Sequence, residues 1–257
     1  MKEWKEIKKD ALRIFDYSLD LSFKNRGKEY EGWWYPSFLF HNLFICIHEK
    51  YKRDDSKSMT SLQYRRLPIW RRLVYWSSIA GYAGLYEVVA WAMRFMVEDI
   101  TQDIYLDQKL GNSLIGMKLG EWSNRRKERW GFADYIKEID IPPFLKKKVK
   151  PLYGRLCQYV HPSREHIEME VTSGRIYQEY VEREFDKSSK RHIQTCDIVI
   201  SLVLCHFPQI VECLPRYTGI AENFIQDLRK RGFNCTARIC EERSEYCTDS
   251  HSYLSEK

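Results

Sequence analysis

The sequence is poor in the residues that interrupt regular structure, and it lacks the short motifs of several common enzyme classes. Among its 257 residues, glycine occurs 12 times and proline 8 times. It contains no glycine-rich phosphate loop, no G-x-S-x-G nucleophile elbow and no H-E-x-x-H zinc motif. These absences argue against P-loop nucleotide hydrolases, α/β-hydrolases and zincin metalloproteases.

Strand patterns, internal repeats and a secretion signal are missing as well. No series of regularly spaced β-patterned segments is found, and no repeat of fixed period is visible. The first residues, MKEWKEIKKDALRIF, carry charges throughout and do not form the apolar stretch of a signal peptide. We therefore expect a cytoplasmic protein in which disulfides are not the default state of the eight cysteines.

What the sequence does contain is helical periodicity, in a composition typical of a folded domain. Hydrophobic residues make up 44% of the chain and charged residues 30%. Apolar residues recur at helical spacing over residues 2–24. From Pro68 to Leu110 the pattern meets no further proline, which indicates one long helix or two helices in near continuity. Residues 165–176 are the best candidate for a short strand or an irregular loop.

The stretch from Val74 to Met93 has the length of a membrane span and only one charge, Glu87. Its glycines, tyrosines, serines and tryptophans, and its unbroken continuation into RFMVEDITQDIYLD, favour a buried central helix over a span. We predict an all-α, single-domain helical bundle over residues 1–232. A polar, cysteine-containing C-terminal tail is predicted over residues 233–257.

Basic residues are in modest excess, and the net charge of +6 suits a partner that carries phosphates. The run at residues 146–150 supplies four candidates for nucleic-acid binding: Lys146, Lys147, Lys148 and Lys150. Aromatic residues are interleaved with the basic runs, and bases stack on such rings. The alternative is that each basic run is a solvated helix face.

Arg155 and His161 stand six positions apart at the end of a predicted helix, in RLCQYVHPS. A ribonuclease without a metal needs a group that moves protons, which a histidine provides, and a positive charge on the phosphate, which an arginine provides. Six helical residues turn the chain by roughly 240°, so the two side chains do not share a face of an ideal helix. Pro162 favours an extended His161 and is the feature that must redirect its ring.

At these two residues the sequence resembles the HEPN superfamily of helical-bundle proteins. The signature of this superfamily is an arginine, four to six residues and then a histidine on a late helix, and five residues separate Arg155 from His161. The resemblance implies a HEPN-like bundle with extra C-terminal helices, metal-independent endoribonuclease activity with this pair as catalytic residues, and a homodimer. Many members act in toxin–antitoxin or antiviral-defence systems, so the resemblance also implies an antitoxin or defence-system partner.

The same residues have a structural interpretation. In that alternative, His161 and Ser163 cap the end of the helix, and Arg155 is a surface charge. The protein would then be a non-catalytic helical module that binds nucleic acid or a partner protein. This alternative predicts salt-sensitive RNA or DNA binding, or a stable complex, without turnover.

Acidic residues on the long predicted helix form two groups. Glu87, Arg94 and Glu98 share one face of a largely apolar helix, where charges must be paired or must face a polar cleft. They form either an internal network that fixes the bundle or, together with Ser163, a polar floor beneath the Arg–His pair. The second group, Asp99, Asp103 and Asp107, follows i, i+4 spacing on another face, and we expect it to be solvated rather than metal-binding.

The C-terminal tail supplies four potential zinc ligands within seventeen residues: Cys235, Cys240, Cys247 and His251. A tetrahedral site of this composition would anchor a tail too polar to pack by itself. The spacing lacks the close Cys-x2-Cys pairs of the commonest zinc sites, and the tail also has the composition of a frayed terminus. No other cofactor is expected.

Overall fold

The computed structural model describes residues 30–160, 182–218 and 223–251, together with isolated positions between 5 and 24. Within these ranges the side chains of residues 30, 31, 217 and 244–251 are not included. This part of the chain is helical throughout its regular structure and contains no strand, which confirms the all-α prediction. The strand or loop predicted at residues 165–176 lies outside the described residues.

From α2 to α8 the helices are connected by short turns. In chain order they are α2 (Tyr30–Tyr51), α3 (Asp55–Thr60), α4 (Leu62–Tyr82), α5 (Tyr86–Leu110), α6 (Ile115–Lys127), α7 (Phe132–Glu138), α8 (Pro143–Val160), α10 (Glu182–His206), the 3-10 helix η2 (Pro208–Ile210), α11 (Leu214–Thr218), α12 (Phe224–Lys230) and α13 (Asn234–His251).

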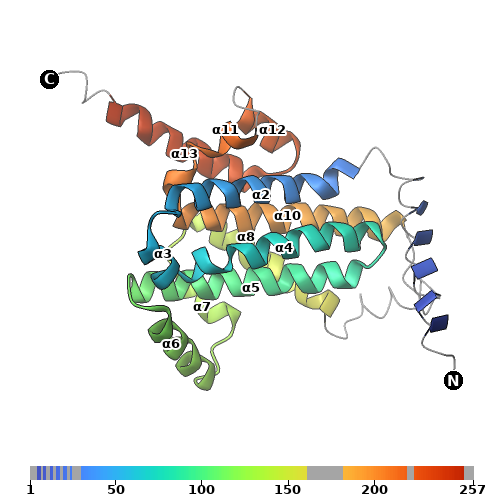
Figure 1. Ribbon diagram of the computed structural model, residues 1–257, viewed down its shortest axis with the longest axis horizontal. Helices are drawn as coiled ribbons and strands as arrows, with labels where there is room; N and C mark the ends of the chain where they lie inside the picture. The colour runs from blue at the N-terminus through green and yellow to red at the C-terminus, as the bar shows by residue number, and fades with distance from the viewer. Residues whose placement is uncertain are drawn as a thin grey trace.

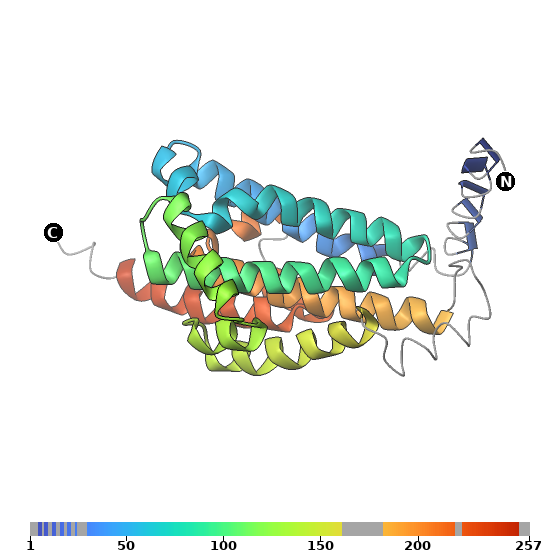
Figure 2. The ribbon, with the colours of Figure 1, turned by 90° about the horizontal axis from the view of Figure 1, so that it is seen from below.

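The long helices lie side by side along the longest axis of the molecule (Figures 1 and 2). Helix α5 contacts α4, α8 and α10, and α10 in turn contacts α2, α4 and α13. The short helices α6 and α7 pack against α5, and α11 and α12 lie beside α2 and α13. Two central helices, α5 and α10, therefore hold the bundle together.

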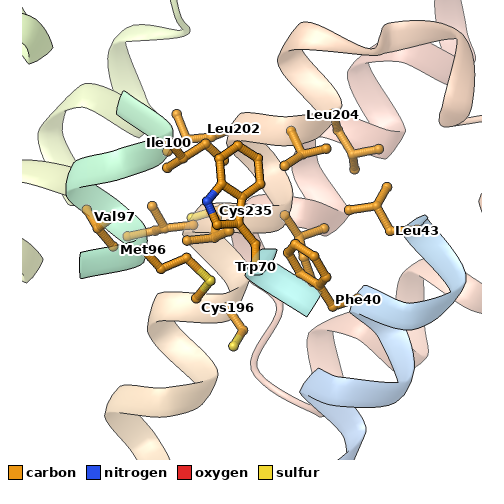
Figure 3. Close-up of a cluster of buried hydrophobic side chains, with 14 of the residues drawn as sticks. Phe40, Leu43, Trp70, Met96, Val97, Ile100, Cys196, Leu202, Leu204 and Cys235 are labelled. Carbon is orange, nitrogen blue, oxygen red and sulfur yellow. The ribbon is translucent and has the colours of Figure 1, made fainter. Parts of the chain in front are cut away.

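Trp70 of α4 lies at the centre of the core shown in Figure 3 and is fully buried. Phe40 and Leu43 of α2 lie on one side of its indole, and Met96 and Val97 of α5 lie on the other. The indole Nε1 donates a hydrogen bond of 2.8 Å to Asp99, so the polar edge of this large ring is satisfied inside the core.

The chain reverses direction where the sequence predicted helices in near continuity. Helices α4 and α5 are antiparallel neighbours, and residues 83–85 form the reversal. Gly84 has a φ of 77°, a conformation that side chains other than glycine rarely adopt, and the Leu85 amide donates to the Ala80 carbonyl at 2.8 Å. Apolar periodicity continues across this turn because both helices bury residues in the same core.

The stretch from Val74 to Met93 therefore contains the end of α4, the reversal and the start of α5. Among the described residues, no helix combines the length and the apolar character needed to cross a membrane. The preference for buried bundle helices over a span agrees with this finding.

The aspartate ladder on α5 is buried, so the prediction that it is solvated was wrong. Asp99, Asp103 and Asp107 face α4, where Arg66 forms ion pairs with the first two; its Nε lies 3.4 Å from Asp103 Oδ2. Burial dominates over this attraction and raises the pKa of Asp103 to about 8.

Asp107 caps the N-terminus of α4. It accepts hydrogen bonds from the Leu62 amide at 3.0 Å and the Ser61 hydroxyl at 3.0 Å, which supplies acceptors for the first turn of that helix. Another partner is the ammonium of Lys118, fully buried on α6, at 2.8 Å. The unpaired amides of a helix N-terminus explain why a carboxylate is buried here.

The segment after residue 232, which was predicted to be a polar tail, forms helix α13 as far as His251. The first half of α13 packs on α10 and buries Phe233, Cys235 and Cys240. Asp197 of α10 accepts hydrogen bonds from the Cys235 amide at 2.9 Å and from the amide of Thr236 at 2.8 Å. This carboxylate caps α13 from a neighbouring helix, and residues 233–240 pack on the bundle through their buried apolar side chains.

Candidate functional site

A cleft of about 610 Å³ opens between α8, α10 and the turn that joins α12 to α13. Basic side chains from all three elements converge on it, although they are far apart in the sequence. They are Lys147, Lys148 and Arg155 from α8, Lys190 from α10, and Lys230 and Arg231 from the α12–α13 turn.

Helix α8 presents its cations to the cleft because of its amphipathic pattern. Lys147, Lys148 and Arg155 occupy positions i, i+1 and i+8, which share one side of the helix. The other side buries Val149 and Leu156 in the core. Pro151 lies inside α8, which continues through it from Pro143 to Val160.

The α12–α13 turn adds cations from another direction. Helix α12 ends at Lys230, and Gly232, with a φ of 89°, allows the chain to turn directly into α13. Arg231 is partly neutralised, because its Nε donates to both carboxylate oxygens of Asp227 at 3.0 Å and its guanidinium stacks on Tyr35. Lys230 is exposed beside it.

Asp197 is the one carboxylate among the residues that line the cleft. Both of its oxygens accept hydrogen bonds from α13, and burial raises its pKa. In the described part of the chain, no carboxylate pairs with Lys147, Lys148, Arg155, Lys190 or Lys230. The cleft therefore carries an excess of positive charge and is chemically suited to an anion with several phosphates.

The structure divides the lysine run that the sequence singled out. Lys147 and Lys148 line the cleft, whereas Lys146 donates to the Lys137 carbonyl at 3.1 Å and Lys150 is exposed on α8 outside the lining. Lys190 was not recognised in the sequence as a site residue. Nothing around it marks it, because its neighbours in the cleft come from distant segments.

The Arg–His pair is described only in part. Arg155 is exposed in the cleft, and α8 ends at Val160, immediately before His161. His161, Pro162 and Ser163 lie outside the described residues. The last turn of α8 is held on α10 by Tyr159, whose hydroxyl accepts from Arg191 while the guanidinium stacks on the ring at 3.8 Å.

The predicted acidic face of α5 joins that helix to α8. Arg94 lies 3.8 Å from Glu98, and both contact the hydroxyl of Tyr153, at 3.5 and 3.1 Å respectively. Burial raises the pKa of Tyr153 to about 12. Neither residue of α5 lines the cleft that contains Arg155. Glu87 is half-buried in the first turn of α5.

Two of the four potential zinc ligands lie in the core. Cys235 and Cys240 are buried beside α10, and burial raises the pKa of each thiol to about 12, which opposes the thiolate form that zinc binds. The described side chains include no cluster of three or more metal-ligating groups. The zinc site stays a prediction, since the side chains of Cys247 and His251 are not included.

Comparisons of this chain with protein-family models, with curated proteins and with solved structures found no match in any of the three. The resemblance to the HEPN superfamily rests on Arg155 and His161 and stays a prediction.

Proposed function

We propose that this protein is a cytoplasmic RNA-binding protein that holds the phosphates of its RNA in the basic cleft. The observation that carries this proposal is the convergence of five cations from α8, α10 and the α12–α13 turn, none of which pairs with a carboxylate among the described residues. Such convergence concentrates charge, and each cation that neutralises a phosphate releases a counterion on binding.

The lining of the cleft indicates how RNA would be recognised. Its described lining includes lysine, arginine, glutamine and asparagine side chains and, within that part of the chain, no phenylalanine, tyrosine or tryptophan. The contacts that these side chains would make are to the phosphate backbone. Binding of this kind tolerates different sequences and weakens steeply as salt is added.

The experiment is fluorescence anisotropy with labelled single-stranded RNA over a series of salt concentrations. The double variant Lys148→Glu/Lys190→Glu should bind at least about tenfold more weakly, and loss of two phosphate contacts should reduce the salt slope by about 1.4. Lys50→Glu, at an exposed position of α2 away from the cleft, is the matched control. Equal loss in both variants, or unchanged binding in the double variant, would contradict the proposal.

A second candidate function, RNA cleavage without a metal, is favoured by the position of Arg155. This residue lies among the phosphate-binding cations, and the helix that carries it ends one residue before His161. In this candidate, Arg155 grips the scissile phosphate and His161 transfers a proton. The resemblance then also implies a homodimer and a toxin–antitoxin or antiviral-defence partner.

Incubation of mixed RNA in EDTA separates the two candidates. Cleavage by the wild type, with loss in both Arg155→Ala and His161→Ala, supports the nuclease. RNA that is bound but stays intact would support binding without cleavage. Cleavage that survives His161→Ala would contradict the catalytic role of His161.

A further inference from the structure

The outer face of the α4–α5 hairpin carries an unusual number of exposed apolar side chains. Trp76 and Trp91 are 61% and 60% exposed, and Ile69, Val88 and Phe95 are between 44% and 52% exposed. On α4 the spacing is i, i+7, and on α5 it is i, i+3, i+7, so each group is a stripe along its helix. We call these five residues the hairpin patch.

The two stripes lie on the same side of the hairpin. Trp70 pairs with Asp99 and Arg66 pairs with Asp103, which fixes the antiparallel register and puts Trp76 level with Met93, between Trp91 and Phe95. Arg66 and Asp99 point toward the neighbouring helix and serve as reference directions. At 100° per residue about the helix axis, Ile69 and Trp76 are rotated by about 60–80° from Arg66. The three residues of the α5 stripe are rotated by about 20–80° from Asp99 in the same sense. In antiparallel helices, equal senses of rotation lead to the same face.

The patch is large enough to contribute the centre of a protein interface. A fully buried ring removes about 150–250 Å² from water, so three rings at these exposures, with Ile69 and Val88, offer on the order of 400 Å². This is about half of the ~800 Å² that each partner buries in a standard interface. The enrichment in tryptophan is also typical of interface centres.

Charges border the patch with opposite signs on its two edges. Arg65 and Arg72 lie along the α4 edge, and Glu87 and Glu98 lie along the α5 edge. About the axis of its own helix, each pair is rotated by about 100–120° from the reference residue, which is Arg66 on α4 and Asp99 on α5. The charges therefore lie just beyond the apolar stripe. A surface with one positive and one negative edge is complementary to a second copy of itself.

We propose that the hairpin patch is the interface between two copies of this chain, related by a twofold axis parallel to α4 and α5. This axis places α4 of one copy over α5 of the other, so the tryptophans meet at the centre. Arg72 of each copy then lies at the same height along the axis as Glu98 of the other copy. An isologous contact of this kind closes after two subunits. The patch shares no residue with the basic cleft, and its test does not depend on RNA binding.

The test is light scattering coupled to size-exclusion chromatography over a dilution series. Wild type should be a dimer, and Trp91→Glu should be a monomer with an unchanged far-UV circular dichroism spectrum. Met117→Glu replaces a side chain that is 62% exposed on α6, outside the patch, and should remain a dimer. A monomeric wild type, including one that binds anionic vesicles through this face instead, overturns the proposal. A Trp91→Glu variant that dimerises like wild type also overturns it.

The orientation is tested by charge reversal. Arg72→Glu alone should weaken the dimer by about tenfold, and the added change Glu98→Gln, which removes the new like-charge contact and keeps an acceptor for the Tyr153 hydroxyl, should restore part of the loss. A double variant that is as weak as Arg72→Glu, with both proteins folded, would overturn the placement of α4 over α5.

Discussion

The basic cleft and the aspartate ladder of α5 both contain charged residues, but these are exposed in the cleft and buried in the ladder. In the ladder, Asp107 and Lys118 are buried together at 2.8 Å and each has further hydrogen bonds. In the cleft, Lys148 and Lys190 are exposed and have no carboxylate partner among the described residues. Charges satisfied inside the protein contribute to the fold, whereas charges left for solvent are available to a ligand.

The largest effect is expected from breaking the buried pair. Lys118→Met would leave the Asp107 carboxylate without its cation and the Gly111 carbonyl without its donor at 2.7 Å. We expect a loss of about 3–5 kcal/mol in the free energy of unfolding, measured by urea denaturation.

The matched control is Lys109→Met, which removes an exposed lysine paired with Glu121 at 2.6 Å on the same region of the bundle. Its loss should be at most about 1 kcal/mol, because solvent screens this pair. Equal losses in the two variants would show that the buried and exposed pairs do not differ as argued.

The pH dependence of stability should be a smaller effect for each pH unit, and it should be specific to the ladder. Burial raises the pKa of Asp103 from 3.8 to about 8. Between these values the folded state holds a proton that the unfolded chain has lost, so stability falls as the pH rises from about 4 to about 8, by up to about 1.4 kcal/mol per pH unit. Asp103→Asn should remove this part of the slope in unfolding experiments across that window. An unchanged dependence of unfolding free energy on pH in this variant would contradict the raised pKa of Asp103.

The smallest effect on stability is expected in the cleft. Lys148→Ala and Lys190→Ala remove exposed charges that repel one another, so the free energy of unfolding should stay within about 0.5 kcal/mol of wild type or rise slightly. Thermal unfolding measures this. A loss as large as that of Lys118→Met would show that these lysines support the fold and are not reserved for a ligand.

The sequence predicted a useful part of this structure and a smaller part of the candidate site. Helical periodicity predicted the all-α class, and the basic run indicated Lys147 and Lys148. The reversal at Gly84 was missed because apolar periodicity is the same on both sides of a tight turn that faces one core. Lys190 was missed because only the contact between α8 and α10 brings it to the cleft.

By itself, the sequence determined the all-α class, since the spacing of apolar residues is a local property that each helix must satisfy alone, but it assigned the residues of α13 to a polar tail. It did not determine which charges are buried. Asp103 and Asp107 have the spacing of a solvated ladder, yet Arg66, Lys118 and the first turn of α4 cover them. Only the tertiary structure decides this, because the free energy of a buried charge depends on partners that lie elsewhere in the chain.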